Sequence, residues 1–291
     1  MKLQEFNDLI CPIEGYPLIR HDGGWRCAGG HHFDQAKMGY VNLLPVQNKK
    51  SLAPGDSKEM VAMRRDFLAA GFYQQLASNL ADSIEIVITN SCANNPFVVL
   101  DAGCGEGYYL DQVLERLESL PNDDRELQAI GVDISKFAIQ AACKKRKSGL
   151  RWLVASNSQL PLAEQSVDLI VCAFGFACFE MFKKVLKPGG HLIMLDPGPE
   201  HLIEMRKVIY SNIKPFREPD CESALNAGFT IANTERWQCQ VDNVSQAYLE
   251  KLLGMTPHLH RAPRSGIEAV KSRSSLNLTV DVHVRKFVLS S

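Results

Sequence analysis

The sequence predicts an α/β protein whose largely parallel sheet carries helices on both faces. The first observation is an apolar run at residues 97–100, rich in β-branched side chains, which is typical of a strand buried on both faces. The second is a glycine-rich turn at residues 103–107, directly followed by a helical segment. The third is another strand at residues 130–133, some thirty residues on, which also ends in an acid.

The glycine-rich turn places Gly103, Gly105 and Gly107 at alternate positions. Glycine permits unusual backbone dihedrals and lets the main chain approach a ligand closely. Asp101 ends the first strand and Asp133 ends the second. Open α/β sheets bind ligands beyond the carboxyl ends of their strands, where an acid is well placed to bind two ribose hydroxyls. We therefore expect a nucleoside-binding edge; the alternative is a strand-turn-helix unit without a ligand.

The D-x-G-x-G-x-G turn resembles the S-adenosylmethionine (SAM) site of class I methyltransferases more than the G-x-G-x-x-G turn of dinucleotide binders. A dinucleotide site holds a pyrophosphate on a helix N-terminus, and the carboxylate of Glu106 would repel that group. SAM instead carries a sulfonium and an amino group, so acids suit it. We expect the backbone amides of residues 103–107 to bind the amino-acid part, with Glu106 near the amino group and Asp133 under the ribose.

Composition predicts a soluble cytoplasmic protein. The 291 residues are 45% hydrophobic and 22% charged, with a net charge of −1. No apolar run reaches membrane-spanning length, and residues 1–5 do not resemble a signal peptide, so no membrane partner is expected. The nine cysteines are scattered, and Cys143, Cys172 and Cys178 are expected to be reduced core thiols.

Basic residues cluster locally, although the net charge of the whole chain does not by itself indicate a nucleic-acid partner. No DNA partner is expected. One late cluster and one early cluster flank the sheet domain, so they could form a single phosphate-binding surface. A third cluster, residues 144–147, is expected to be a solvated face. The first two clusters are Lys49, Lys50, Lys58, Arg64 and Arg65, and then Arg261, Arg264, Lys271 and Arg273.

Residues 1–45 predict a small zinc-ribbon-like module, followed by a helical linker at 46–96 and the sheet domain at 97–291. A segment this short has little core and often needs a metal. The spacing suggests Cys11, Glu14, Cys27 and His31 as ligands, although structural zinc sites prefer thiolate and imidazole to carboxylate. Two alternatives remain: His21 or His32 replaces Glu14, or the metal has been lost and the cysteines merely pack.

Further elements follow from apolar periodicity and capping signals. Asp56 or Ser57 is expected to cap a helix that ends at Gly71. The remaining expected helices are 74–88, 108–120, 136–147 (capped by Ser135), one ending at 186, 201–213 and 244–253; the remaining strands are 151–154, 166–174, 191–195 and an antiparallel pair, 230–239 with 281–289.

Nearly the whole chain resembles, in collinear order, the bacterial 23S ribosomal RNA (guanine-N1)-methyltransferases. The most restrictive shared runs are F-D-x-A-K-x-G-Y-V-N-L-L-P at 33–45 and P-G-P-x-H-L at 197–202. The others are Cys11, Cys27 and His31, P-G-D-S at 54–57, R-R-x-F-L-x-A-G-x-Y at 64–73, L-D-x-G-C-G-E-G-Y-Y at 100–109, K-P-G-G at 187–190 and M-T-P at 255–257.

The resemblance implies a class I, Rossmann-like SAM-dependent methyltransferase domain behind an N-terminal zinc-binding module that recognises RNA. It adds Tyr73 and His201 as cofactor contacts, and it implies a homodimer acting on 23S ribosomal RNA. Two features depart from the family pattern. Glu14 stands where the second zinc cysteine is expected, and residues 174–177 (F-G-F-A) replace a less aromatic, proline-containing segment.

Guanine N1 bears a proton at neutral pH, so its methylation needs a base. Asp34, Asp196 and His201 are candidates because they lie near motif ends, and the sequence does not choose among them. N1 is hidden in a paired guanine, so the base is expected to turn out of a hairpin loop. The chain has no Asn/Asp-Pro-Pro-aromatic motif and no Pro-Cys pair, which argues against amino-group methylation and against a covalent cysteine route.

The residues that follow two later strands each have two possible roles. Ser156 and Asn157 follow the strand that usually holds the adenine in such enzymes, and polar turn residues are the alternative. Phe176 either lines the substrate pocket or packs in the core. Two other functions stay open at this point: a SAM-dependent small-molecule methyltransferase, and a non-catalytic RNA-binding relative.

Overall fold

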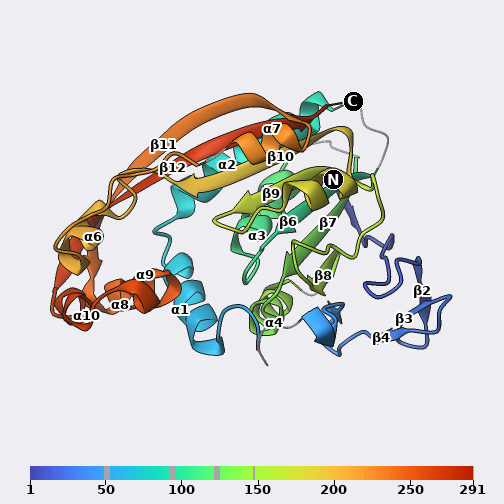
Figure 1. The fold of residues 1–291 in the computed structure, drawn as a ribbon, viewed down its shortest axis with the longest axis horizontal. Coiled ribbons are helices and arrows are strands. Elements are labelled where there is room, and N and C mark those ends of the chain that lie inside the picture. The colour runs from blue at the N-terminus through green and yellow to red at the C-terminus, as the bar shows by residue number, and fades with distance from the viewer. Residues whose placement is uncertain (49–52, 92–95, 121–124, 147, 220, 291) are drawn as a thin grey trace.

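The computed structural model describes all residues except 49–52, 92–95, 121–124, 147, 220 and 291. A nine-stranded mixed sheet runs through the molecule, with helices on both faces (Figure 1). Its strand order is β11-β12-β10-β9-β6-β7-β8-β5, and β1 pairs with β7 beside this path. The predicted α/β class with a largely parallel sheet is confirmed.

The centre of the sheet is parallel, and two long strands close one edge as an antiparallel pair. Apolar side chains fill both faces, which explains the near-continuous apolar runs of the central strands. The strands are β6 (Phe97–Ala102), β7 (Glu126–Asp133), β8 (Leu150–Val154), β9 (Val167–Ala173), β10 (Leu186–Pro197), β11 (Phe229–Ser245) and β12 (Ser275–Leu289).

Ten α-helices lie in the described part of the chain. Figure 1 places α6 and α8–α10 together at the far end of β11 and β12, opposite the N-terminal module. The helices are α1 (Lys58–Ala69), α2 (Gln74–Asn90), α3 (Tyr108–Glu118), α4 (Lys136–Lys145), α5 (Phe179–Val185), α6 (Ile203–Ile209), α7 (Glu222–Asn226), α8 (Gln246–Met255), α9 (His258–Arg261) and α10 (Arg264–Lys271). None of them is long and apolar enough to cross a membrane.

Two of the expected helix caps are present. Ser57 accepts a hydrogen bond from the N–H of Met60 at the start of α1, and Ser135 accepts one from Ala138 at the start of α4. The expected helix at 201–213 is shorter, because α6 starts at Ile203 only after Leu202 adopts a left-handed backbone. Cys143 and Cys172 are buried free thiols as expected, whereas Cys178 is only half-buried and is not a core residue.

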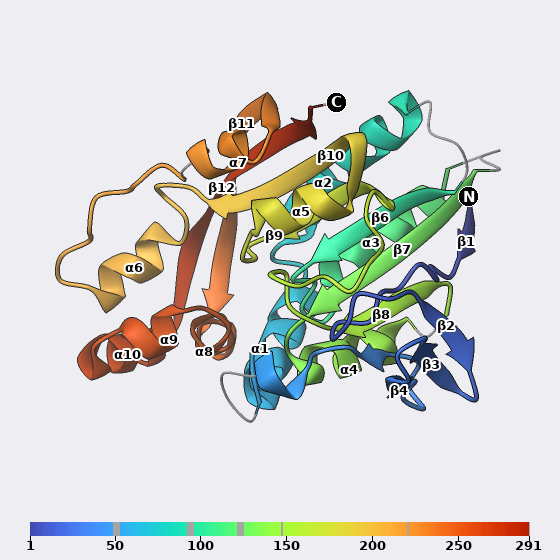
Figure 2. The same ribbon diagram turned by 45° about the vertical axis from the view of Figure 1, so that its right-hand side comes forward.

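The N-terminal segment contributes to both sheets. β2 (Leu18–His21), β3 (Gly24–Cys27) and β4 (His32–Asp34) form a separate antiparallel sheet. The flanking strands β1 (Lys2–Gln4) and β5 (Val41–Asn42) instead extend the large sheet, through β7 and β8. The small sheet lies beside β8 at the edge of the molecule (Figure 2).

Arg151 joins the small sheet to the large one. It stands on β8 with a fully buried side chain, and its guanidinium lies 5.0 Å from the ring centroid of Trp25 on β3. Arg151 also donates to the carbonyl of Phe6 at 3.0 Å and pairs with Glu5 at 2.9 Å. A buried guanidinium needs such partners, so these contacts fix the position of the N-terminal module on the sheet.

Candidate active site at the carboxyl edge of the sheet

The glycine turn folds back onto the next strand. Gly103, Gly105 and Gly107 all have positive φ, at 91°, 56° and 77°. A side chain at Gly107 would collide with the indole of Trp152, which fills the space beside the turn. The N–H groups of Gly103 and Cys104 both donate to the carbonyl of Val132, at 2.8 and 3.0 Å. These two amides are therefore used within the protein, which corrects the expectation for them but leaves that for the N–H of Glu106 untested.

Asp133 lies at the tip of β7 with each oxygen oriented by the backbone. Oδ1 accepts the N–H of Ser135 at 2.7 Å, and Oδ2 accepts that of Gly105 at 2.9 Å. Burial raises the pKa of Asp133, while these two N–H groups and Arg64 oppose the shift. Each carboxylate oxygen can accept a second hydrogen bond. The carboxylate is thus preorganised to hold two neighbouring hydroxyls.

Asp101, at the end of β6, is almost fully buried. Burial, together with the negative charges of Asp133 and Glu106, raises the pKa of Asp101 to about 8. A nearby cation would favour the ionised form of such a group. The edge therefore has the electrostatics of a cation-binding site.

Glu106 is paired with a residue that the sequence did not connect to it. Arg64, on α1, donates through Nε to Glu106 at 2.6 Å and also pairs with Asp56. The carboxylates of Glu106 and Asp56 raise the pKa of Arg64 against the effect of burial. Glu106 is thus already paired, and the side chain of Arg64, 20% exposed, is held between two carboxylates, so it does not belong to an exposed phosphate-binding cluster as predicted.

The loop before α1 is bound to the tip of β7. Ser135 donates its hydroxyl to the carbonyl of Asp56 at 2.7 Å. Gly55 approaches so closely that a Cβ there would lie 2.8 Å from Cβ of Ser135. The P-G-D-S motif therefore lies directly beside the residues that follow Asp133.

Four rings from distant parts of the chain gather beyond β9. The ring of Phe174 lies 5.7 Å from that of His201, 6.3 Å from Tyr109 and 6.5 Å from Tyr73, between centroids. Tyr73 Oη and His201 Nε2 are 3.4 Å apart. The structure thus brings Tyr73 and His201 together beside the glycine turn's helix, α3, as members of one cluster.

Both ring nitrogens of His201 are engaged. Nδ1 accepts the N–H of Asp281 at 3.3 Å, so neutral His201 carries its proton on Nε2, which faces Tyr73. Burial lowers the pKa of His201 to about 4. A neutral imidazole in this tautomer has no free lone pair, so His201 does not fit the predicted role of general base.

The P-G-P-x-H-L loop is held in place by Asp281 on β12. Its carboxylate accepts the N–H of Glu200 at 2.7 Å and pairs with Arg236 at 2.8 Å. A Cβ at Gly198 would lie 2.6 Å from this carboxylate, which explains the glycine. The sequence did not indicate Asp281, because no local motif marks a residue that holds a loop about 80 positions earlier in the chain.

The other two base candidates lie in different places. Asp196, near the carboxyl end of β10, is one-fifth exposed, and Arg285 donates to its Oδ2 from both Nε and Nη2. Asp34 lies on β4 of the small sheet, 90% exposed and beside His32. Of the three candidates, Asp196 alone combines a position at the carboxyl edge with a partly exposed carboxylate.

Asn157 and Phe176 meet at the same edge. Asn157 donates through Nδ2 to the carbonyl of Phe176 at 2.8 Å, and Ser156 shares a 2.8 Å hydrogen bond with Ser158. The Phe176 side chain is 76% exposed. The alternative that Phe176 packs in the core is therefore wrong.

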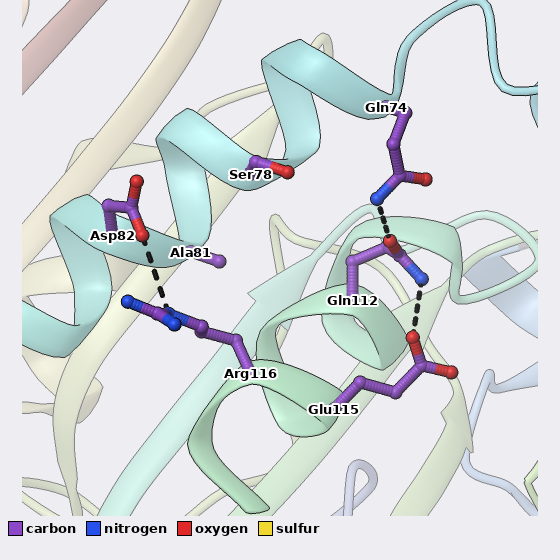
Figure 3. A pocket seen from close by; sticks show the side chains of 7 residues that line it. All are labelled: Gln74, Ser78, Ala81, Asp82, Gln112, Glu115 and Arg116. Atoms are coloured by element: carbon purple, nitrogen blue, oxygen red, sulfur yellow. Dashed lines mark hydrogen bonds and ion pairs between the residues drawn. The ribbon is translucent and has the colours of Figure 1, made fainter. Parts of the chain in front are cut away.

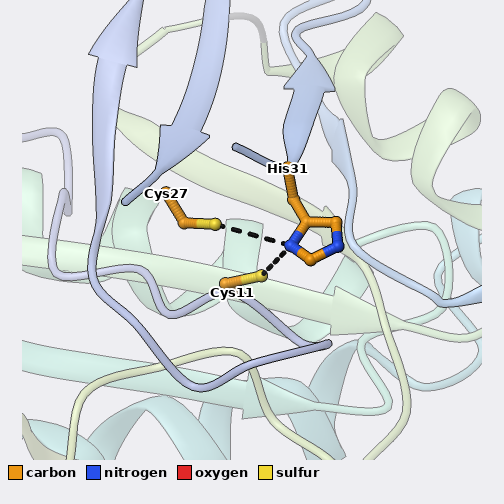
Figure 4. Close-up of side chains that lie close together, drawn as sticks. All are labelled: Cys11, Cys27 and His31. Atoms are coloured by element: carbon orange, nitrogen blue, oxygen red, sulfur yellow. Dashed lines mark hydrogen bonds between the residues drawn. The ribbon is translucent and has the colours of Figure 1, made fainter. Parts of the chain in front are cut away.

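A second cluster of chemical interest lies in the N-terminal module (Figure 4). The ligand atoms of Cys11, Cys27 and His31 all lie within 4.8 Å of one another. Nδ1 of His31 is 3.7 Å from Sγ of Cys11 and 3.6 Å from Sγ of Cys27. Ligand atoms about 2.0–2.3 Å from a tetrahedral zinc ion would be roughly 3.3–3.8 Å apart, so this set fits zinc.

Glu14 reaches the same cluster. Its Oε2 lies 3.2 Å from His31 Nδ1 and 3.7 Å from Cys27 Sγ. The absence of a side chain at Gly29 makes room for this carboxylate, because a Cβ there would overlap Oε2. Of the two histidines considered as replacements, His21 pairs with Asp22 and His32 with Asp34 instead.

A hollow of about 430 Å³ lies between α2 and α3 (Figure 3). Its polar side chains largely bind one another: Gln74 to Gln112, Gln112 to Glu115, and Arg116 to Asp82. The lining residues are Gln74, Ser78, Ala81, Asp82, Gln112, Glu115 and Arg116. This self-paired surface offers no reactive group.

Comparison with known proteins identifies the class of protein to which this chain belongs. A family described as "Methyltransferase domain" matches residues 93–243, more than half of the chain. The N-terminal family "RlmA, N-terminal", a zinc ribbon, matches residues 9–52. The chain belongs to the methyltransferase-domain family and uses SAM, which fits an edge formed by Asp101, Asp133 and the glycine turn.

Three relatives narrow the family further. A candidate 23S rRNA (guanine-N1)-methyltransferase of Micromonospora griseorubida is 29% identical over 95% of each chain. Another candidate of that name, YxjB of Bacillus subtilis, is 29% identical over 88% of this chain and 87% of its own. The 23S rRNA (guanine(748)-N(1))-methyltransferase of Streptomyces fradiae is 31% identical over 68% of this chain and 66% of its own. The recognition of this family from sequence motifs is confirmed.

Proposed function

We propose that this protein transfers a methyl group from SAM to N1 of a guanine in a hairpin loop of 23S ribosomal RNA. The observation that carries the proposal is a likeness spanning both the N-terminal ribbon and the catalytic domain. It extends over 95% of the chain in one of the relatives named for this reaction. The carboxyl edge supports the proposal, because it combines strand-end acids with a cluster of aromatic rings.

SAM supplies an electrophilic methyl group, and the protein's task is alignment, because the displacement needs the nucleophile in line with the breaking bond. Asp133 would hold the ribose hydroxyls, and Asp101 would face the amino group. Asn157 would border the adenine. Tyr73 and His201 would form the wall between cofactor and substrate, because their rings lie in one cluster with Phe174.

Asp196 is the residue we propose as the base that takes the N1 proton. It stands one residue before the end of β10, and Arg285 orients its carboxylate through Oδ2. Asp196→Asn should abolish methylation while leaving SAM binding unchanged, and His201→Asn should retain a measurable rate. Equal loss in both variants, or full activity of Asp196→Asn, would contradict this assignment.

RNA would bind along the exposed lysines and arginines of α1 and of the α8–α10 end. These two groups are neighbours in space, because Lys251 of α8 pairs with Asp66 of α1 at 2.6 Å. Lys58, Arg65, Arg261 and Arg264 are exposed. Lys49, Lys50 and Lys147 of the predicted basic clusters lie outside the described residues. Association as a homodimer and a cytoplasmic location complete the proposal.

We also propose zinc as a structural ion of the ribbon, held by Cys11, Glu14, Cys27 and His31. Glu14→Cys should keep one zinc per chain, because thiolate is the preferred ligand, and Cys11→Ser should release it. Zinc analysis by mass spectrometry on purified protein tests this assignment. Glu14→Ala with undiminished zinc affinity would remove Glu14 from the ligand set.

The experiment that tests the function uses tritiated SAM and large-subunit RNA from a strain lacking the enzyme. We expect label in 23S RNA and a reverse-transcription arrest at one guanine, because methylation at N1 blocks base pairing. Label that enters only a small-molecule extract would favour a metabolite methyltransferase.

A further inference from the structure

Phe176 is an exposed aromatic side chain at a position where the chain has little freedom. It follows the end of β9, and its carbonyl accepts the Asn157 hydrogen bond at 2.8 Å. The preceding Gly175 lies against the glycine turn. A Cβ at Gly175 would lie 3.0 Å from the carbonyl of Ala102, and one at Gly103 would lie 3.6 Å from Cα of Gly175. The backbone of Phe176 is thus fixed beside the cofactor turn while its ring faces solvent.

Phe174, two residues before, has a strained backbone. Its φ is +54°, a left-handed conformation that a bulky side chain rarely adopts. Its N–H still donates to the carbonyl of Leu195 at 2.9 Å, so the β9–β10 ladder continues up to this residue. The reversal at Phe174 therefore occurs where the ladder ends. Such strain persists where the surrounding structure imposes it, and it often occurs at functional sites.

The two rings differ in their surroundings. Phe174, 37% exposed, lies against the rings of Tyr73, Tyr109 and His201, whereas Phe176 is 76% exposed. An exposed phenylalanine ring contributes less to the stability of the fold than a buried one, because its apolar surface stays in water. A ligand that covers the ring when bound would supply that burial. The ring's position beside the cofactor turn means that this ligand is the methyl acceptor.

We propose that Phe176 is the platform on which the target purine base stacks, and that Phe174 is a positioning residue that directs it. This inference rests on the proposed function, since it specifies the acceptor as a splayed-out base. A base removed from its helix loses its stacking partners, and an aromatic side chain replaces them. Phe176 thereby holds the base against the cofactor, while the aromatic cluster around Phe174 closes the pocket behind it.

The test compares four variants of the full-length protein: Phe176→Ala, Phe176→Leu, Phe176→Trp and, as the control, Ile86→Ala. Ile86 is 57% exposed on α2, so it reports the effect of removing an exposed apolar side chain elsewhere. Stacking is worth enough that Phe176→Ala should raise KM for unmodified 23S RNA about tenfold or more. Phe176→Leu should be nearly as poor, Phe176→Trp should rescue, and the affinity for S-adenosylhomocysteine should stay unchanged in all four.

A spectroscopic readout separates stacking from mere structural support. The indole of Phe176→Trp should lose fluorescence on addition of the RNA, beyond any change in the wild type, because it stacks on a base. A wild-type protein that methylates no RNA would overturn the proposed function itself. RNA methylation that is equally efficient in Phe176→Ala, or rescued as well by leucine as by tryptophan, would overturn the stacking role and leave the function standing.

Discussion

The two halves of the carboxyl edge are built in different ways. At the tip of β7, the backbone N–H groups of Gly105 and Ser135 hold the carboxylate of Asp133, and at the tip of β6 the carboxyl group of Asp101 is buried. Beyond β9, the rings of Tyr73, Tyr109, Phe174 and His201 meet, with Phe174 on a left-handed backbone, and two residues further along the chain Phe176 is 76% exposed. The first half offers oriented polar groups, which suit the cofactor-binding role proposed for it, and the second offers an aromatic surface.

This difference indicates a division of roles between the halves. A cofactor that is the same in every turnover suits a rigid polar site whose groups are already satisfied. A base that must leave its helix can be bound by stacking on aromatic side chains, because stacking requires only a planar ring and few directed hydrogen bonds. Substitutions in the first half should therefore act on cofactor affinity, and those in the second half on the use of RNA.

The largest effect is expected for Asp133→Ala. Removing the carboxylate deletes two charge-assisted hydrogen bonds, each worth about 1.5–3 kcal/mol, so S-adenosylhomocysteine should bind at least about 100-fold more weakly. Isothermal calorimetry measures this loss. Asp242→Ala, at an exposed acid on β11, is the matched control. Undiminished affinity in Asp133→Ala would remove the cofactor from this strand tip.

A smaller effect is expected for Tyr73→Phe. The substitution keeps the ring but removes the partner of His201 Nε2, 3.4 Å away, and a lost buried hydrogen bond costs about 1–3 kcal/mol. We expect kcat/KM for RNA to fall about tenfold, with the protein still folded by circular dichroism. Tyr16→Phe, at a half-exposed tyrosine of the ribbon, should have no effect. Identical kinetics in both variants would show that the Tyr73–His201 contact is dispensable.

The smallest effect concerns pH. The pKa of Asp101 is raised to about 8 by burial and by Asp133 and Glu106, so free Asp101 is mostly protonated at pH 7. The cofactor's amino group favours the carboxylate, and binding must therefore release a proton below pH 8. Affinity should rise about fivefold between pH 7 and pH 8 and level off above that range. Asp101→Asn should flatten the curve; a wild-type affinity independent of pH would contradict this linkage.

Sequence reasoning predicted the features that are local in the chain. The glycine turn, the strand-end acids and the Ser57 and Ser135 caps each depend on a few consecutive residues. The antiparallel closing strands could also be predicted, because their apolar residues alternate. The metal cluster followed from spacing alone, although only the structure brings Glu14 to within 3.2 Å of His31.

The features that could not be predicted depend on contacts between distant segments. Arg64 looked like part of a basic surface, yet it is buried against Glu106, 42 positions away. No local propensity signals the left-handed backbone of Phe174 or the exposure of Phe176. The tautomer that excludes His201 as a base is set by the N–H of Asp281. Each of these depends on tertiary packing, which overrides local preference.

The central claim is methyl transfer to guanine N1 at this edge of the sheet. The direct measurement is nucleoside mass spectrometry of unmodified 23S RNA after incubation with SAM and either the wild type or Asp133→Ala. The account predicts one N1-methylguanosine per RNA molecule from the wild type and none from the variant. Methylation of a different base or atom, or equal methylation by both proteins, would contradict it.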